Sequence, residues 1–99
     1  DPFAKDAFLT VRNGSPGYDI TWVSWAHVGR GENRLSSPLS PGQEKRYTLD
    51  AKGDYIYDFT VESNHPQYPS CTGTEVHFYE GREVWVTLRD DSFDWDANL

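Results

Sequence analysis

Apolar and polar residues alternate with a period of two along most of the chain, and the 3.6-residue period of an amphipathic helix is nearly absent. Successive side chains of a strand point to opposite faces, so this alternation predicts β-structure. The clearest example runs from Asp54 to Glu62, with its rings and Val61 on one face and acidic residues and Thr60 on the other. We predict six strands: Ala7 to Arg12, Asp19 to Val28, Lys45 to Leu49, Asp54 to Glu62, Thr74 to Tyr79 and Glu83 to Arg89.

The second predicted strand follows a turn rich in Gly, Pro and Asn, from Asn13 to Gly17. Strict alternation puts Ile20 and Trp22 on one face and Trp25 on the other. Because both faces then carry rings, we expect this strand to be central or covered on both sides.

Between the strands lie two long polar loops, from Gly29 to Gln43 and from Asn64 to Gly73, and a tight hairpin connection at residues 80–82. Long parallel crossovers are not expected, because no helical segment is available to carry them. We therefore predict an all-β fold, an antiparallel β-sandwich of about six to seven short strands in one domain spanning residues 1–99. Residues 1–6 are expected to form a flexible N-terminal arm, and residues 90–99 an acidic C-terminal tail with no strand to pair with.

Charge and composition limit the classes of partner and the cellular location that we expect. The 99 residues carry a net charge of −7, which argues against nucleic acid or an anionic membrane surface as a partner. No apolar run approaches the roughly 18 residues of a membrane-spanning helix, so we expect no membrane insertion. The chain begins at Asp1 without an initiator Met, as a mature protein does after a leader is removed, so a secreted or periplasmic location is expected. The single cysteine, Cys71, is either a buried thiol or an inter-chain crosslink.

Short turn and strand motifs follow one another in a characteristic order. They are Asn13 to Gly17-Tyr18-x-Ile20, Gly31-x-Asn33-x-Leu35, Leu39-x-Pro41-Gly42, Gly53-x-Tyr55 and Tyr57-Asp58. The chain between Leu9 and Val61 resembles a group of small exported bacterial β-proteins that share this order. The resemblance implies a β-sandwich fold and an exported protein, and it implies no catalytic activity.

The sequence contains few indications of catalytic activity. His27, His65, His77 and Cys71 are ingredients of nucleophilic catalysis, but none lies in a recognised motif such as a Gly-x-Ser-x-Gly elbow. We expect a protein that is not an enzyme and that needs no cofactor.

Metal binding is the main alternative, in two versions. Acidic residues near the C-terminus offer oxygen ligands suited to Ca²⁺, with Asp54 or Asp58 as an additional ligand; the four are Asp90, Asp91, Asp94 and Asp96. His65, Cys71 and His77 offer nitrogen and sulfur ligands suited to Zn²⁺ or copper. A solvated acidic tail is the competing interpretation of the first cluster.

Aromatic residues are more numerous than a core of this size requires, at 15% of the chain. Those outside the best core faces are candidate anchors for a protein or sugar surface: Trp25, Tyr68, Tyr79, Trp85 and Trp95. Open sheet edges and the N-terminal arm also permit strand addition between copies of the chain. We predict a non-enzymatic structural or interaction module that binds a protein partner or copies of itself, as a monomer or a homo-oligomer, with divalent-metal binding as the alternative.

Overall fold

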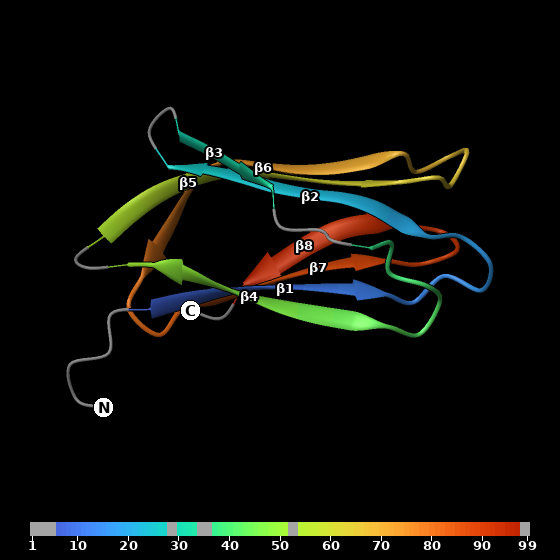
Figure 1. Ribbon diagram of the computed structural model, residues 1–99, viewed down its shortest axis with the longest axis horizontal. Coiled ribbons are helices and arrows are strands. Elements are labelled where there is room, and N and C mark those ends of the chain that lie inside the picture. The colour runs from blue at the N-terminus through green and yellow to red at the C-terminus, as the bar shows by residue number, and fades with distance from the viewer. Residues whose placement is uncertain (1–5, 28–29, 34–36, 52–53, 98–99) are drawn as a thin grey trace.

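The computed structural model describes residues 6–27, 30–33, 37–51 and 54–97. Within these ranges the chain forms eight strands and no helix, and the strands make two packed layers (Figure 1). The predicted all-β sandwich is confirmed. The strands are β1 (Asp6–Asn13), β2 (Ile20–His27), β3 (Arg30–Asn33), β4 (Glu44–Asp50), β5 (Asp54–Ser63), β6 (Ser70–Tyr79), β7 (Glu83–Leu88) and β8 (Phe93–Ala97).

Each layer is a four-stranded sheet. The first sheet has the strand order β4-β1-β7-β8, and the second has the order β3-β2-β5-β6. Strands pair antiparallel throughout except for β1 and β7, which pair parallel with Phe8 opposite Glu83 and Asn13 opposite Leu88. The chain between these two strands forms β2 to β6, which are distributed over both sheets, so the parallel pairing needs no helical crossover. The lack of a helical segment therefore does not exclude a parallel pair of strands.

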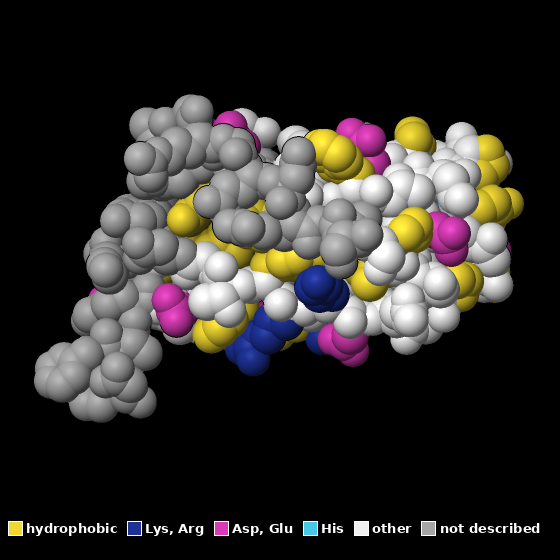
Figure 2. Space-filling model, viewed as in Figure 1, with side chains coloured by type: hydrophobic (Ala, Val, Ile, Leu, Met, Phe, Trp, Pro, Cys, Tyr) yellow, Lys and Arg dark blue, Asp and Glu magenta, His cyan; other side chains and the backbone are white. Residues whose placement is uncertain are grey.

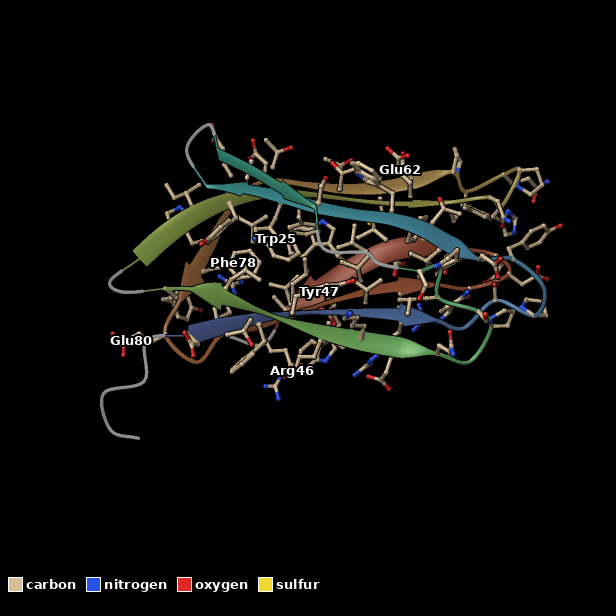
Figure 3. All side chains as sticks on the ribbon, viewed as in Figure 1. Trp25, Arg46, Tyr47, Glu62, Phe78 and Glu80 are labelled. Carbon is tan, nitrogen blue, oxygen red and sulfur yellow. The ribbon has the colours of Figure 1, made fainter. Side chains whose placement is uncertain are left out.

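Alternate residues of both sheets meet in one core. Leu9 and Val11 of β1 and Val84 and Val86 of β7 are fully buried, and they face Val23, Phe59 and Val61 of the second sheet. Trp25 and Tyr47 point toward each other between the layers, with ring centroids 5.1 Å apart (Figure 3). The expected inward face of β5 is confirmed at the three positions Tyr57, Phe59 and Val61.

A bulge at the start of β2 changes the predicted faces of that strand. The pairing with β5 shifts register between Ile20 and Trp22, so the strict alternation breaks there. Ile20 is buried and Trp22 is 41% exposed, whereas the sequence placed both on one face. The strand is internal to its sheet, between β3 and β5, as expected. The exposure of Trp22 shows that the outer face of this internal strand is not covered.

Two strands lie in segments that the sequence assigned to a loop and to a tail. The predicted loop from Gly29 to Gln43 contains β3, and the predicted acidic tail contains β8, which pairs with β7. In β8 the apolar residues Phe93, Trp95 and Ala97 alternate with Asp94 and Asp96, and this period of two was hidden by the density of acidic residues. The predicted loop from Asn64 to Gly73 also ends early, because β6 begins at Ser70. Of the predicted arm, Asp6 opens β1, and residues 1–5 lie outside the described ranges.

Asn13 organises the turn between β1 and β2. Its buried side chain donates from Nδ2 to the carbonyl oxygens of Tyr18 and Leu39, at 2.7 and 2.8 Å. Its Oδ1 accepts from both the backbone N–H and the hydroxyl of Ser15. The motif that opens with Asn13 is therefore explained by turn structure. Every polar atom of the side chain is bonded, which is what burial of an amide requires.

Candidate functional site

The outer face of the first sheet carries a regular array of charged, hydroxyl and aromatic side chains. Residues that pair across strands share a face, and the register aligns two rows across all four strands. One row is Arg46, Thr10, Trp85 and Asp96 on β4, β1, β7 and β8. The next row is Glu44, Arg12, Thr87 and Asp94 on the same strands.

The orientation of this face is visible from the side. Arg46 points away from the second sheet, whereas the adjacent Tyr47 points into the core (Figure 3). Basic side chains appear beside acidic ones along the lower margin of the molecule, over β4 (Figure 2). The face is therefore polar and mixed in charge rather than uniformly acidic, despite the net charge of −7.

An open groove of about 330 Å³ lies on this face. We call it the Trp85 groove. It is lined by Arg12, Trp85, Thr87, Arg89, Asp94, Trp95 and Asp96. Its volume is at the lower end of the roughly 300–1,000 Å³ that is typical of small-ligand sites.

Each of the two cations of the groove has a defined partner. Arg12 Nε lies 3.7 Å from Glu44 Oε2, and its guanidinium lies 5.6 Å from the centre of the Trp85 ring. Arg89 Nη1 lies 3.5 Å from Asp94 Oδ1. These pairs are exposed, so they contribute little to stability, but they orient both guanidinium groups at the rim.

The other end of the Trp85 row, at Thr10 and Arg46, is held by a second network. Thr10 donates its hydroxyl to Glu83 Oε2 at 2.6 Å, and Arg46 Nε lies 3.6 Å from the same oxygen. The Arg46 guanidinium also lies 3.7 Å from the centre of the Phe8 ring. Thr10 is buried beneath these side chains although it faces outward. The β1 and β7 strands under the groove are therefore tied together by side chains as well as by their backbones.

The five aromatic residues predicted as anchors have different environments. Trp25 is a core residue against Tyr47, and Tyr68 is half-buried against the ring of His65 at 5.0 Å, so neither is an exposed anchor. Tyr79 is 40% exposed with the Arg82 guanidinium 4.9 Å from its ring centre. Only the remaining two, Trp85 and Trp95, line the groove.

Trp95 is shared between the core and the surface. Its ring packs edge-on against Phe59 at 5.5 Å, and the residue is 38% exposed at the edge strand β8. Arg12, Thr87 and Arg89 line the groove but were not predicted from the sequence. Arg12 reaches the groove because the parallel pairing of β1 with β7 places it opposite Thr87.

The structure does not assemble the predicted metal sites. Among the described residues no group of three or more His, Cys, Asp or Glu side chains is placed to hold a metal ion. Asp94 is paired with Arg89, Asp96 Oδ1 accepts the backbone N–H of Ala97, and Asp90 and Asp91 are exposed before β8. The side chain of Asp58 is engaged elsewhere, accepting the N–H of Glu75.

The predicted His and Cys ligands are also separated. Cys71 and His77 both lie on β6, six residues apart, which corresponds to about 20 Å along a strand. Cys71 is buried in the core and His77 is exposed on the outer face. The prediction that these two residues and His65 form a Zn²⁺ or copper site is therefore wrong, because the side chains do not lie close together.

His65 is a structural residue at one end of the sandwich. It is 4% exposed, its Nδ1 accepts the backbone N–H of Gln67, and its Nε2 lies 3.1 Å from the carbonyl oxygen of Asp90. Its ring lies 4.3 Å from that of Tyr18. The imidazole thereby contacts the β1–β2 loop through its ring and the β7–β8 loop through Nε2, while Nδ1 is bonded within its own β5–β6 loop.

Cys71 is a free thiol that is 7% exposed, opposite Val61 in the register of β5 and β6. Burial, together with the nearby charge of Asp94, raises the pKa of the thiol to about 11. Burial and protonation of the thiol disfavour the predicted inter-chain crosslink through Cys71, because a buried, protonated thiol reacts slowly. The alternative of a buried thiol is the one observed.

The described part of the chain contains no helix with the length and hydrophobicity needed to span a lipid bilayer. Neither protein-family models nor curated protein sequences match the chain. A functional assignment therefore depends on the geometry of the outer face of the first sheet.

Proposed function

We propose that this protein is a non-catalytic binding module whose ligand surface is the Trp85 groove. The observation that carries the proposal is a half-buried indole on a sheet face, bordered by two arginines and two aspartates that are oriented by defined contacts. Ligand sites typically combine an apolar or aromatic floor with a few placed polar groups. We also propose that the module acts outside the cytoplasm, in a secreted or periplasmic setting.

Binding is favoured over catalysis by the residues that line the groove. They include no histidine, cysteine or serine, and both carboxylates are already engaged, Asp94 with Arg89 and Asp96 with the backbone N–H of Ala97. Nucleophilic and acid–base catalysis require a nucleophile or an acid–base group within hydrogen-bond reach of a partner that activates it. The groove instead offers fixed donors and acceptors around a ring.

The position of the groove on strands supports the same proposal. Its side chains come from the internal strands β1 and β7, from the adjoining β8 and from Arg89, which follows β7. A site on strands of a rigid scaffold holds its side chains more accurately than a site on loops. Such a face is suited to binding without a large conformational change.

Strand addition at an edge is a less favoured mode of interaction along β6. Glu75 of β6 has a φ of 53°, and its N–H is bonded to the side chain of Asp58 rather than to a regular ladder partner. Irregularities of this kind disrupt the ladder of an edge strand and disfavour pairing with another chain. A partner is therefore expected on the sheet face, not along this edge.

Chemical-shift mapping by NMR tests the proposal. ¹⁵N-labelled protein is titrated with separate sets of oligosaccharides, short peptides and small anions. Shifts confined to the amides of Arg12, Trp85, Thr87, Asp94 and Asp96 are expected for at least one set. Trp22→Ala, which removes an exposed tryptophan from the outer face of the second sheet, is the matched control and should leave those shifts unchanged. Shifts that cluster around Trp22, or none for any set, would overturn the proposal.

A further inference from the structure

We infer that the ligand of the Trp85 groove is an uncharged saccharide, with one sugar ring stacked on the indole of Trp85. This inference rests on the proposed binding function and specifies its ligand. It is carried by three properties of the groove: the balance of its charges, the mixture of its hydrogen-bonding groups and the presence of an aromatic surface.

The charges of the groove favour a ligand without net charge. The lining contains two arginines and two aspartates, so its formal charges cancel. An anionic ligand would also be repelled by the net charge of −7 on the whole protein, and a cation would meet the two guanidinium groups at the rim. An uncharged ligand meets neither penalty.

The hydrogen-bonding groups of the groove match hydroxyl groups. Arginines only donate, carboxylates only accept, and a threonine hydroxyl does both. A sugar hydroxyl also donates and accepts at once, so neighbouring hydroxyls can bond a carboxylate and a guanidinium together. Asp96 lies beside Trp85 in the same row, and Thr87 lies beside Asp94 in the next, which places acceptors along one side of the indole.

Arg12 supplies donors over the ring of the indole. Because it contacts both Glu44 and the Trp85 ring, its guanidinium is restrained before a ligand arrives. Restraint of this kind lowers the entropic cost of binding for a long side chain. A sugar ring on the exposed part of the indole would therefore lie between the donors of Arg12 and the acceptors of β8.

The aromatic floor distinguishes a sugar from other uncharged polar ligands. The face of an indole carries negative charge density, and the C–H groups on one face of a pyranose ring present a weakly positive, apolar surface to it. The volume of about 330 Å³ suits a short segment of a saccharide rather than an extended polymer surface.

The experiment is a glycan microarray followed by calorimetry, using uncharged oligosaccharides of glucose, xylose, mannose, galactose and N-acetylglucosamine. Oligogalacturonates and heparin fragments supply the charged arm, and uncharged tetrapeptides supply the peptide arm. At least one uncharged oligosaccharide is expected to bind. Trp85→Ala and Asp96→Asn should each weaken that binding about tenfold or more, because truncating a central aromatic or charged anchor typically has this effect.

Two further variants keep the result interpretable. Trp85→Phe retains a ring on the groove floor and should lose less affinity than Trp85→Ala, while Trp22→Ala should stay within about twofold of the unmodified protein. Thermal unfolding of each variant verifies that the sandwich is folded before affinity is compared.

The outcomes separate the inference from the function on which it rests. If peptides or charged glycans perturb the groove amides and no uncharged glycan binds, the saccharide inference is wrong and the binding function stands. If an uncharged glycan binds but Trp22→Ala abolishes that binding and Trp85→Ala does not, both are wrong. If no probe of any class perturbs the groove, the proposed function fails together with the inference.

Discussion

The ring of Phe59 lies directly against the backbone of Gly73 on the neighbouring strand. A Cβ added at residue 73 would fall 2.3 Å from Phe59 Cζ and 2.4 Å from Cε2. Phe59 is fully buried and makes edge-on contacts with both Phe78 and Trp95. A glycine inside a strand often marks such a close approach, and here it makes room for the central ring of the core.

We predict that Gly73→Ala destabilises the protein by about 1–3 kcal/mol, since the added methyl group forces a buried ring out of place. Chemical denaturation provides the measurement. Gly17→Ala is the matched control, because nothing lies within 4 Å of a Cβ at residue 17. Equal free energies of unfolding for the two variants would show that Phe59 adapts without cost.

Replacing Asn13 should destabilise the connection between β1 and β2. Asn13→Ala removes four hydrogen bonds and leaves the buried carbonyl of Leu39 without the Nδ2 donor, so we expect a loss of about 2–4 kcal/mol. Denaturant unfolding checks the loss. Asn64→Ala serves as control, since the Asn64 side chain is exposed and accepts one hydrogen bond, from the N–H of Asp19. A comparable loss in both variants would contradict the central role of Asn13.

The hydroxyl of Tyr47 is buried and has no hydrogen-bond partner among the described residues. We expect Tyr47→Phe to leave the free energy of unfolding unchanged or to raise it slightly, since it removes a buried polar atom and keeps the ring against Trp25. Tyr47→Ala should lose about 3–5 kcal/mol, because the ring itself is lost from the core. Urea titration of both variants distinguishes these contributions. A large loss for Tyr47→Phe would reveal a partner for the hydroxyl.

Cys71 should make stability depend on alkaline pH. Its folded pKa is about 11, against an ordinary value of 9.0, so between these values the unfolded chain loses the thiol proton while the folded chain retains it. The folded state is then the one with more bound protons, and the free energy of unfolding falls as pH rises through this interval. Burial raises the pKa of Tyr47 as well, so this residue also lowers the free energy of unfolding as pH rises.

Two measurements examine this prediction. Between pH 8 and pH 11, Cys71→Ala should lose less stability than the unmodified protein in denaturant titrations, because the variant has no thiol to titrate. Iodoacetamide should modify Cys71 slowly in the folded protein and rapidly in denaturant. Fast alkylation under native conditions would contradict the burial of the thiol.

Local patterns in the sequence were sufficient to identify most of the strands and the inward face of β5. Alternation shows which side chains of a strand share a face, and this property depends on residues close in sequence. The predicted hairpin at residues 80–82 was wrong, because β6 and β7 lie in different sheets, but the turn itself was predictable, since Gly81 adopts a φ of 79° that suits a glycine. These features are local, so the sequence alone determined them.

The candidate site was decided by the tertiary structure. The sequence contained Trp85, Asp94 and Asp96 as candidate residues, but it assigned them to separate roles and omitted Arg12. They share one groove because β1 pairs parallel with β7 and because β8 pairs with β7 instead of forming a tail. Strand pairing and register join residues more than 70 positions apart, and the energies that select them come from the packed core. The bulge that exposes Trp22 has the same origin, because local alternation carries no information about a shift imposed by a partner strand.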